Sequence, residues 1–253
     1  MADRRMMDER NTGKMDAGRV ITVEDKEITI FESEQKGAPL VIINTFENEG
    51  EKVWEQLRHI TSTPISLAAI GKINWNDEMS PWPIDPVTKW DEPFTGGADA
   101  YIEKLTAILL PEILKQLSDK PAYTALAGYS LAGLFAIYSL YHTDRFDRIA
   151  SASGSLWYPG FMDYVRAHEM KRAPERLYLS LGDREAKTRN PILQTVQEHT
   201  QAFHQLCLEQ GIQTIYERNP GNHFRDSDER MAKGIAWMIE ESCLQEAMNE
   251  VGS

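Results

Sequence analysis

Residues 126–133 read Leu-Ala-Gly-Tyr-Ser-Leu-Ala-Gly, and this stretch decides which fold the sequence predicts. The apolar run 122–128 is typical of a strand buried on both faces, and 131–141 is typical of a helix. Ser130 therefore lies at the junction, with Gly128 two residues before it and Ala132 two residues after it. A strand-to-helix turn tight enough to expose a serine accepts only small side chains at those two positions. The pattern predicts such a turn with Ser130 as a candidate nucleophile; a turn without chemistry is the alternative.

Outward from Ser130, apolar strands and amphipathic helices alternate along the chain. Besides 122–128, strands are expected as a hairpin at 19–23 and 27–31 and as buried runs at 39–46, 64–71, 146–153, 176–181 and 213–217. Helices are expected at 50–59, from Asp99 as a cap onward with a break at Pro111, at 131–141, from Asn190-Pro191 and from Asp226. This alternation predicts an α/β fold, doubly wound, with a mostly parallel sheet and helices on both faces. Ligands in such sheets bind at the carboxyl ends of the strands.

Size and charge limit the remaining possibilities. We expect residues 1–18 to be a flexible N-terminal segment and 19–253 to form a single domain. The net charge of −12 disfavours nucleic acid and anionic membranes as partners. The polar N-terminus is unlike a secretory signal, and no run approaches the roughly 20 apolar residues of a membrane helix, so we expect a cytoplasmic protein. The two cysteines, Cys207 and Cys243, belong to no metal or disulfide pattern.

His223 is the histidine placed to serve a serine at this edge. It lies in Asn219–Phe224 (NPGNHF), a loop that follows the last predicted strand and precedes the last helix. A general base on that loop can reach a hydroxyl on a neighbouring strand end. The alternative is a histidine that caps the following helix. The five other histidines lie in or beside predicted helices, where an exposed or hydrogen-bonded histidine is expected: His59, His142, His168, His199 and His204.

A carboxylate that orients the histidine should follow the strand at 176–181. Two residues compete there, Asp183 and Glu185. The glycine-x-x-acid spacing from Gly182 favours Glu185, whereas Asp183 lies closer to the strand end, so Asp183 stays as the alternative. The acid would accept the second N–H of the imidazole, select its tautomer and stabilise the imidazolium ion.

An oxyanion hole needs two backbone N–H groups near the serine. We expect one from Leu131, directly after Ser130, and the other from Phe46, in the loop after the strand at 39–46. Aromatic residues near the predicted site are candidates for substrate binding: Tyr129, Trp157 and, in the long segment 72–97, Trp82. Ordinary core packing is the alternative for these rings.

With these residues in place, the sequence resembles the putative esterase family of α/β-hydrolases, which includes enterochelin esterase and S-formylglutathione hydrolase. The matching stretches are AGYSLAGLFA (127–136), SASGSLWY (151–158), LSLGDRE (179–185) and GNHF (221–224). The resemblance spans 39–240 and implies an α/β-hydrolase fold without a large lid. It also implies ester hydrolysis through an acyl-enzyme by Ser130, His223 and an acid near Glu185, a residue that some siderophore esterases of the family lack or use weakly.

The function expected from these observations is hydrolysis of a small-molecule carboxylic ester. Thioester cleavage or acyl transfer by the same residues is an alternative within catalysis. An alternative of another class is a non-catalytic protein of hydrolase fold that binds a ligand along its aromatic loop. No metal or organic cofactor is implied by the sequence, and the sequence leaves the oligomeric state open.

Overall fold

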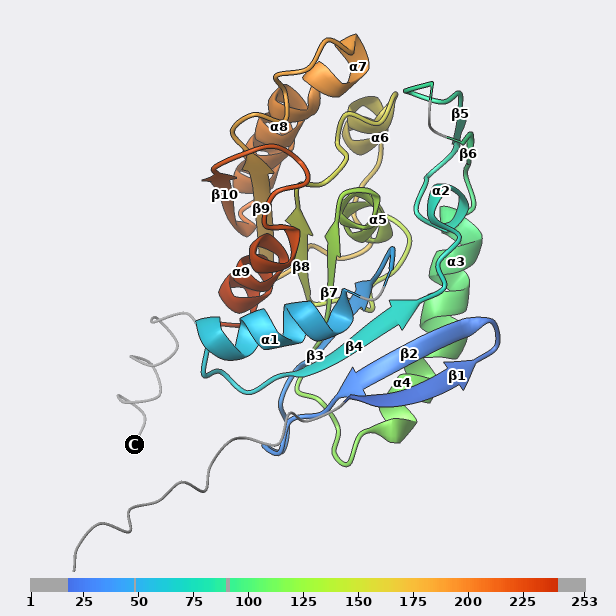
Figure 1. Cartoon of the computed structure of the whole chain (residues 1–253), viewed down its shortest axis with the longest axis vertical. Helices are drawn as coiled ribbons and strands as arrows, with labels where there is room; N and C mark the ends of the chain where they lie inside the picture. Colours follow the sequence, from blue (N-terminus) through green and yellow to red (C-terminus); the bar gives the residue numbers. More distant parts are fainter. Residues whose placement is uncertain (1–17, 48, 90–91, 241–253) are drawn as a thin grey trace, which may run out of the picture.

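The computed structural model describes residues 18–47, 49–89 and 92–240, and these contain an eight-stranded sheet in the order β1-β2-β4-β3-β7-β8-β9-β10 (Figure 1). Its strands are β1 Arg19–Val23, β2 Lys26–Phe31, β3 Leu40–Asn44, β4 Ser66–Gly71, β7 Thr124–Tyr129, β8 Arg148–Ala152, β9 Arg176–Gly182 and β10 Gln213–Asn219. The hairpin β1–β2 pairs antiparallel, β2 pairs antiparallel with β4, and every pairing from β4 to β10 is parallel. The predicted mostly parallel α/β fold is confirmed.

Helices cover both faces of this sheet. They are α1 Gly50–Ile60, α2 Trp75–Glu78, α3 Ala98–Lys104, the π-helical turn η1 Leu105–Leu109, α4 Leu110–Gln116, α5 Leu131–Ser139, α6 Phe161–Ala167, α7 Pro191–Gln194, α8 Val196–Glu209 and α9 Ser227–Ile239. Apolar residues of α1 and α9 share one core layer with alternate residues of β3, β4, β7, β8 and β9. Residues of α3 to α6 and α8 fill the layer on the opposite face. Figure 1 shows α1 and α9 side by side, which is their arrangement in the core.

The order of the strands determines where the candidate catalytic residues lie, because β7 lies in the middle of the parallel part of the sheet. Its neighbours β3 and β8 run in the same direction, so all three strands end at one edge of the sheet. The loops after β3, β7, β8, β9 and β10 therefore converge there, as expected for ligand sites in open α/β sheets.

Two local predictions about helices were wrong. The chain stays helical through Pro111, because η1 precedes it and α4 begins at Leu110. A wider π-helical turn gives the proline ring the room that an α-helical turn denies it. Asp99 does not cap α3, whose cap residue is Gly97; the Asp99 carboxylate instead accepts a hydrogen bond of 2.7 Å from the Tyr138 hydroxyl.

The segment 72–97 carries more structure than its sequence indicates. It contains α2 and a small antiparallel pair, β5 Pro83–Ile84 and β6 Phe94–Thr95.

No helix within the described ranges is long and apolar enough to span a membrane. The expectations for the N-terminal segment and for Cys243 fall on residues outside the described part, which leaves only Gly18 of the first segment in view.

Candidate active site

Ser130 occupies a strained turn between β7 and α5. Its φ of 58° and ψ of −124° are unusual for a residue with a side chain. The turn is held by its backbone: the Ser130 N–H donates to Ala152 at 3.2 Å, and the Ser130 carbonyl accepts from Gly133, Leu134 and Ser155. Strain of this kind persists only where the surroundings over-determine it, and here it turns the hydroxyl out of the core.

The small residue before the serine is a packing requirement. A Cβ atom on Gly128 would lie 2.1 Å from the Ala132 carbonyl oxygen, a backbone atom that cannot swing aside. We expect Gly128→Ala to lower the free energy of unfolding by about 1–3 kcal/mol, the cost of overpacking. Urea denaturation measures this.

The matched control for Gly128 is Gly71→Ala. A Cβ at Gly71 would meet the Glu27 carbonyl at 3.6 Å, an ordinary contact, so we expect a change within about 0.5 kcal/mol. Equal stability of the two variants would contradict the tight turn at Ser130.

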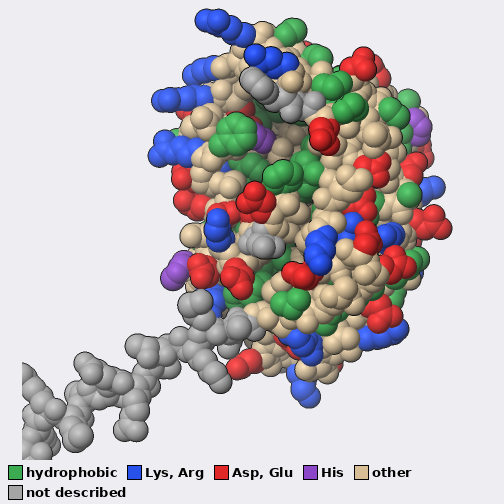
Figure 2. Space-filling view, turned by 45° about the vertical axis from the view of Figure 1, so that its right-hand side comes forward, with side chains coloured by type: hydrophobic (Ala, Val, Ile, Leu, Met, Phe, Trp, Pro, Cys, Tyr) green, Lys and Arg blue, Asp and Glu red, His purple; other side chains and the backbone are tan. Residues whose placement is uncertain are grey.

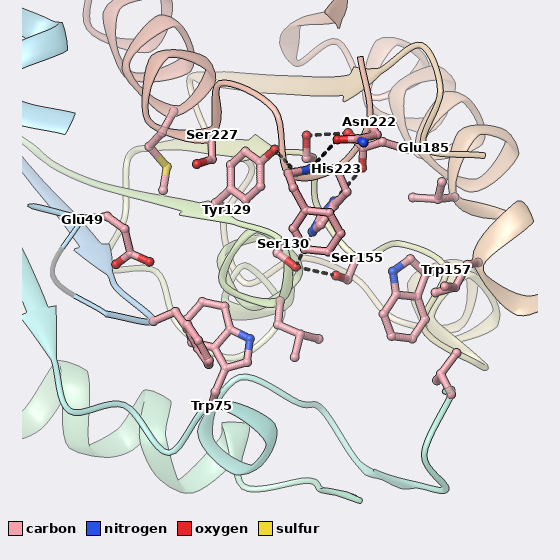
Figure 3. Close-up of a pocket in the computed structure, with 18 of the residues that line it drawn as sticks. Glu49, Trp75, Tyr129, Ser130, Ser155, Trp157, Glu185, Asn222, His223 and Ser227 are labelled. Atoms are coloured by element: carbon pink, nitrogen blue, oxygen red, sulfur yellow. Dashed lines mark hydrogen bonds and ion pairs between the residues drawn. The ribbon is translucent and has the colours of Figure 1, made fainter. Parts of the chain in front are cut away.

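The side chains of Ser130, His223 and Glu185 form a continuous hydrogen-bonded relay (Figure 3). His223 Nε2 lies 3.0 Å from Ser130 Oγ, and His223 Nδ1 lies 2.7 Å from Glu185 Oε2. An ionised Glu185 accepts from Nδ1–H, which leaves Nε2 unprotonated and able to accept the serine proton. These three residues are the ones that the sequence placed on three separate loops.

Glu185 is held as a buried carboxylate with several donors. Its side chain is 4% exposed. Besides His223, it receives hydrogen bonds at Oε1 from the Gly182 N–H at 2.6 Å and the Ser153 hydroxyl at 2.8 Å. Burial raises the pKa of Glu185, but the hydrogen bonds and the charge of His223 oppose this and leave the pKa below its ordinary value. The group therefore stays ionised while it orients the imidazole.

Asp183, the alternative acid, has a different partner. Its carboxylate accepts the Gly221 N–H at 2.8 Å, at the start of the loop that carries His223. This backbone hydrogen bond lowers the pKa of Asp183, and nearby cations add to the effect. Glu185, and not Asp183, contacts the imidazole of His223. The two carboxylates that the sequence offered for this position therefore have different partners.

Arg230 is the residue at this site that the sequence reasoning missed. It comes from α9, is 1% exposed and donates from Nη1 to Glu185 Oε1 at 3.2 Å. The same nitrogen lies 3.3 Å from Ser153 Oγ and 3.3 Å from the Tyr129 hydroxyl, and Nη2 donates to the Pro220 carbonyl at 2.9 Å. In sequence it directly follows Asp228 and Glu229, which favour an exposed first turn of the helix, so no local signal marks it as buried.

Tyr129 supports the histidine loop from the other side. Its hydroxyl donates to the His223 carbonyl at 2.7 Å, and its ring centroid lies 5.4 Å from that of the imidazole. Arg230 and Tyr129 thus hold the backbone of this loop at Pro220 and at His223. Tyr129 also lines the cavity beside Ser130.

A cavity of about 750 Å³ opens over the relay and contains Ser130, Leu131, Glu185 and His223 in its wall. Trp157 lines it, as predicted. Trp82 does not, and this prediction was wrong: its indole N–H donates to the Pro159 carbonyl at 3.0 Å, and its ring packs against three tyrosines, Tyr138, Tyr158 and Tyr164. Trp75, from α2, lines the cavity instead.

The predicted oxyanion-hole residues also reach the cavity. Ile43 of β3 is paired with Ala127 of β7, so Phe46 and Ser130 each lie three residues beyond that pair. Leu131 and Phe46 both line the cavity, and neither backbone N–H donates to an acceptor within the described residues. Such N–H groups at a strand-to-helix turn and a neighbouring loop are available to an anionic oxygen.

The mouth of the cavity is unusually apolar for a surface. Phe224, next to His223, is 88% exposed, and Phe46 is 60% exposed with its ring against Trp75 at 5.2 Å between centroids. Figure 2 shows a hollow in which hydrophobic side chains and a histidine are visible. Exposed apolar side chains grouped at a cleft are typical of a binding surface.

The remaining histidines lie where the sequence placed them, in or beside helices. His199, for example, contacts the Leu156 carbonyl at 2.8 Å, and His142 contacts the Tyr164 hydroxyl at 3.0 Å. Among the residues that the structure describes, no group of three or more histidine, cysteine or carboxylate side chains could hold a metal ion.

A mostly parallel eight-stranded sheet, with a serine on a strained turn after its central strand and a histidine after its last strand, defines an α/β-hydrolase. The chain belongs to the family described as "Putative esterase", whose model matches residues 46–232. It is 24% identical over 189 residues to the uncharacterized protein YbbA of Bacillus subtilis, a match that covers 72% of this chain and 76% of that one.

Solved structures share the fold at low sequence identity. An IroE-like serine hydrolase from Shewanella oneidensis superposes with a TM-score of 0.74 at 17% identity, over 93% of this chain and 86% of that one. The enterobactin esterase FES from Shigella flexneri superposes with a TM-score of 0.64 at 19% identity, over 88% of this chain and 59% of that one. The predicted α/β-hydrolase fold and family are therefore confirmed.

Proposed function

We propose that this protein is a serine hydrolase that cleaves a small-molecule carboxylic ester, with Ser130 as nucleophile, His223 as base and Glu185 as the acid that orients it. The observation that supports this is the relay from Glu185 Oε2 through His223 to Ser130 Oγ, with distances of 2.7 Å and 3.0 Å. Nucleophile and base are within hydrogen-bond reach, and the base is itself oriented by a third group, which is the arrangement nucleophilic catalysis requires.

The geometry supports a two-step reaction. Ser130 Oγ attacks the ester carbonyl while His223 Nε2 takes its proton, and the Leu131 and Phe46 N–H groups stabilise the negative oxygen. The imidazolium then gives the proton to the departing alkoxide, which is released as an alcohol, while the acyl group stays bonded to Ser130 Oγ as an ester. Water attacks this ester, His223 accepts the water proton and returns it to Ser130, and the carboxylic acid is released.

The cavity supports a substrate larger than a simple acetate. Its volume of about 750 Å³ suits a ligand of drug-like size, and its mouth carries the exposed rings of Phe46 and Phe224. Since FES is an enterobactin esterase, siderophore esters belong in the first panel of substrates. Thioesters belong in the same panel, because the relay acts on either acyl group.

The test is labelling with a fluorophosphonate, which reports an activated serine without knowledge of the substrate. We expect one adduct on the wild-type protein, mapped by peptide mass spectrometry to Ser130 and absent from Ser130→Ala. Ser155→Ala is the matched control, because the Ser155 hydroxyl lies in the same cavity, 3.4 Å from Ser130 Oγ, without contacting His223. It should keep the adduct. A folded wild-type protein that stays unlabelled would contradict the proposal and favour the ligand-binding alternative.

A further inference from the structure

The cavity extends to both sides of the nucleophile, and the strand order shows which residues lie on each side. Strand β7, which ends at Ser130, has β3 as its neighbour on one side and β8 followed by β9 on the other. With neighbouring strands about 4.8 Å apart, the end of β9 lies about 10 Å from that of β7. Residues that follow β3 and residues that follow β9 therefore flank Ser130 on opposite sides.

The β9 side of the cavity is cationic. Arg184 and Lys187 follow β9, are exposed, and line the cavity. Neither forms an ion pair within the part of the chain that the structure describes. Their charges act on neighbouring groups. The Gly221 N–H has the main lowering effect on the pKa of Asp183, and the charges of Arg184 and Lys187 lower this pKa further. The carboxylates of Asp183 and Glu185 lie on the same loop, but they accept hydrogen bonds from Gly221 and His223. Arg184 and Lys187 therefore face the cavity without such a partner among the described residues, in a chain of net charge −12.

The β3 side of the cavity is acidic. Glu49 follows β3, and Asp228, at the start of α9, lies close enough to Lys52 of α1 for that charge to act on it. Burial raises the pKa of Asp228 above its ordinary value, although the charge of Lys52 opposes this. Figure 3 shows Glu49 and Trp157 on opposite sides of Ser130. In Figure 2, lysine and arginine side chains gather along one edge of the face that carries the hollow.

We propose that the substrate is an ester with an anionic oxygen group, such as a carboxylate or phosphate, held on the β9 side by Arg184 and Lys187. This rests on the esterase function proposed above. An arginine fork and a lysine ammonium both bind such groups. Glu49 and Asp228 repel the same group on the other side. Charge therefore fixes which half of the ester lies on each side of Ser130.

Two matched pairs of esters test this. In the first, 4-nitrophenyl hydrogen glutarate carries the anion on the acyl half, and 4-nitrophenyl pentanoate is its neutral counterpart. In the second, 3-acetoxybenzoate carries the anion on the alcohol half, and 3-methylphenyl acetate is neutral. Each kcat/KM is divided by the rate constant for alkaline hydrolysis of the same ester. We expect the anionic ester to be preferred in one pair and disfavoured in the other.

The double variant Arg184→Gln/Lys187→Gln should lower the favourable anionic-to-neutral ratio about tenfold, the loss expected for two partly exposed charge contacts. Added salt should shrink the wild-type ratio, because the two cations are exposed. Lys36→Gln is the matched control: Lys36 is exposed in the loop before β3, at the other end of the strands, and its removal should leave both ratios unchanged.

The outcomes separate this inference from the proposed function. Turnover of the neutral esters tests whether the protein is an esterase at all. Given that turnover, a neutral preference in both pairs, an anionic preference in both, or a ratio that survives the double variant would each overturn the assignment of charge. A ratio lost equally in Lys36→Gln would show that only the overall charge matters, which also overturns it.

Discussion

Replacing Glu185 with glutamine is expected to lower kcat/KM for esters about 10⁴-fold, the loss associated with a wrong histidine tautomer in a serine triad. Glu185 Oε2 accepts the Nδ1–H of His223 at 2.7 Å. A glutamine can turn its NH₂ group to that nitrogen, which favours the proton on Nε2. Nε2 then donates to Ser130 instead of accepting its proton. Steady-state kinetics on an ester that the wild type hydrolyses measures the loss.

Asp183→Asn is the matched control, because Asp183 lies two residues earlier on the same loop. Its contact is the Gly221 N–H, which an asparagine oxygen also accepts. We expect its kcat/KM to fall less than about tenfold, since only a charge-assisted backbone hydrogen bond is weakened. Circular dichroism and thermal melting of both variants exclude unfolding as the cause. A larger loss in Asp183→Asn than in Glu185→Gln would transfer the role of the acid to Asp183.

The sequence could place Ser130, His223 and Glu185 at one edge of the sheet because each follows a strand that its own apolar run reveals. Parallel strands end at one edge, so three loops that are 38 to 93 residues apart in sequence could be placed together. The fold class followed from the same runs. The expectation that the strands are parallel was enough to predict that these loops meet.

The errors concern side-chain direction and packing, which local patterns do not carry. Trp82 and Trp75 lie in the same irregular segment, and only the folded chain shows that Trp82 packs inward against tyrosines while Trp75 reaches the cavity. A proline inside a helix usually breaks or kinks it, yet the π-helical turn before Pro111 accommodates the ring. Arg230 resembles a surface cation until the loops from β9 and β10 cover it.

Replacing Arg230 with methionine is the second large effect that we expect, a loss of about 3–5 kcal/mol in the free energy of unfolding. Arg230 and Glu185 form an ion pair whose side chains are 2% and 4% exposed. Removing one partner of a buried pair leaves the other charge without compensation, and this costs more than the pair itself contributes. Arg225→Met is the control, because Arg225 pairs with Asp226 at the surface and should change stability by less than about 1 kcal/mol.

Arg230→Lys separates the positioning of the relay from stability alone. A lysine keeps the positive charge near Glu185, but its single ammonium group cannot reproduce the fork that reaches both Glu185 and the Pro220 carbonyl. We expect it to recover stability relative to Arg230→Met while kcat stays reduced and KM stays near the wild-type value. Below the melting temperature of each variant, a kcat equal to wild type in Arg230→Lys would show that the charge suffices. An unchanged stability in Arg230→Met would show that the ion pair is dispensable, because the buried carboxylate would then be satisfied by Gly182, Ser153 and His223 alone.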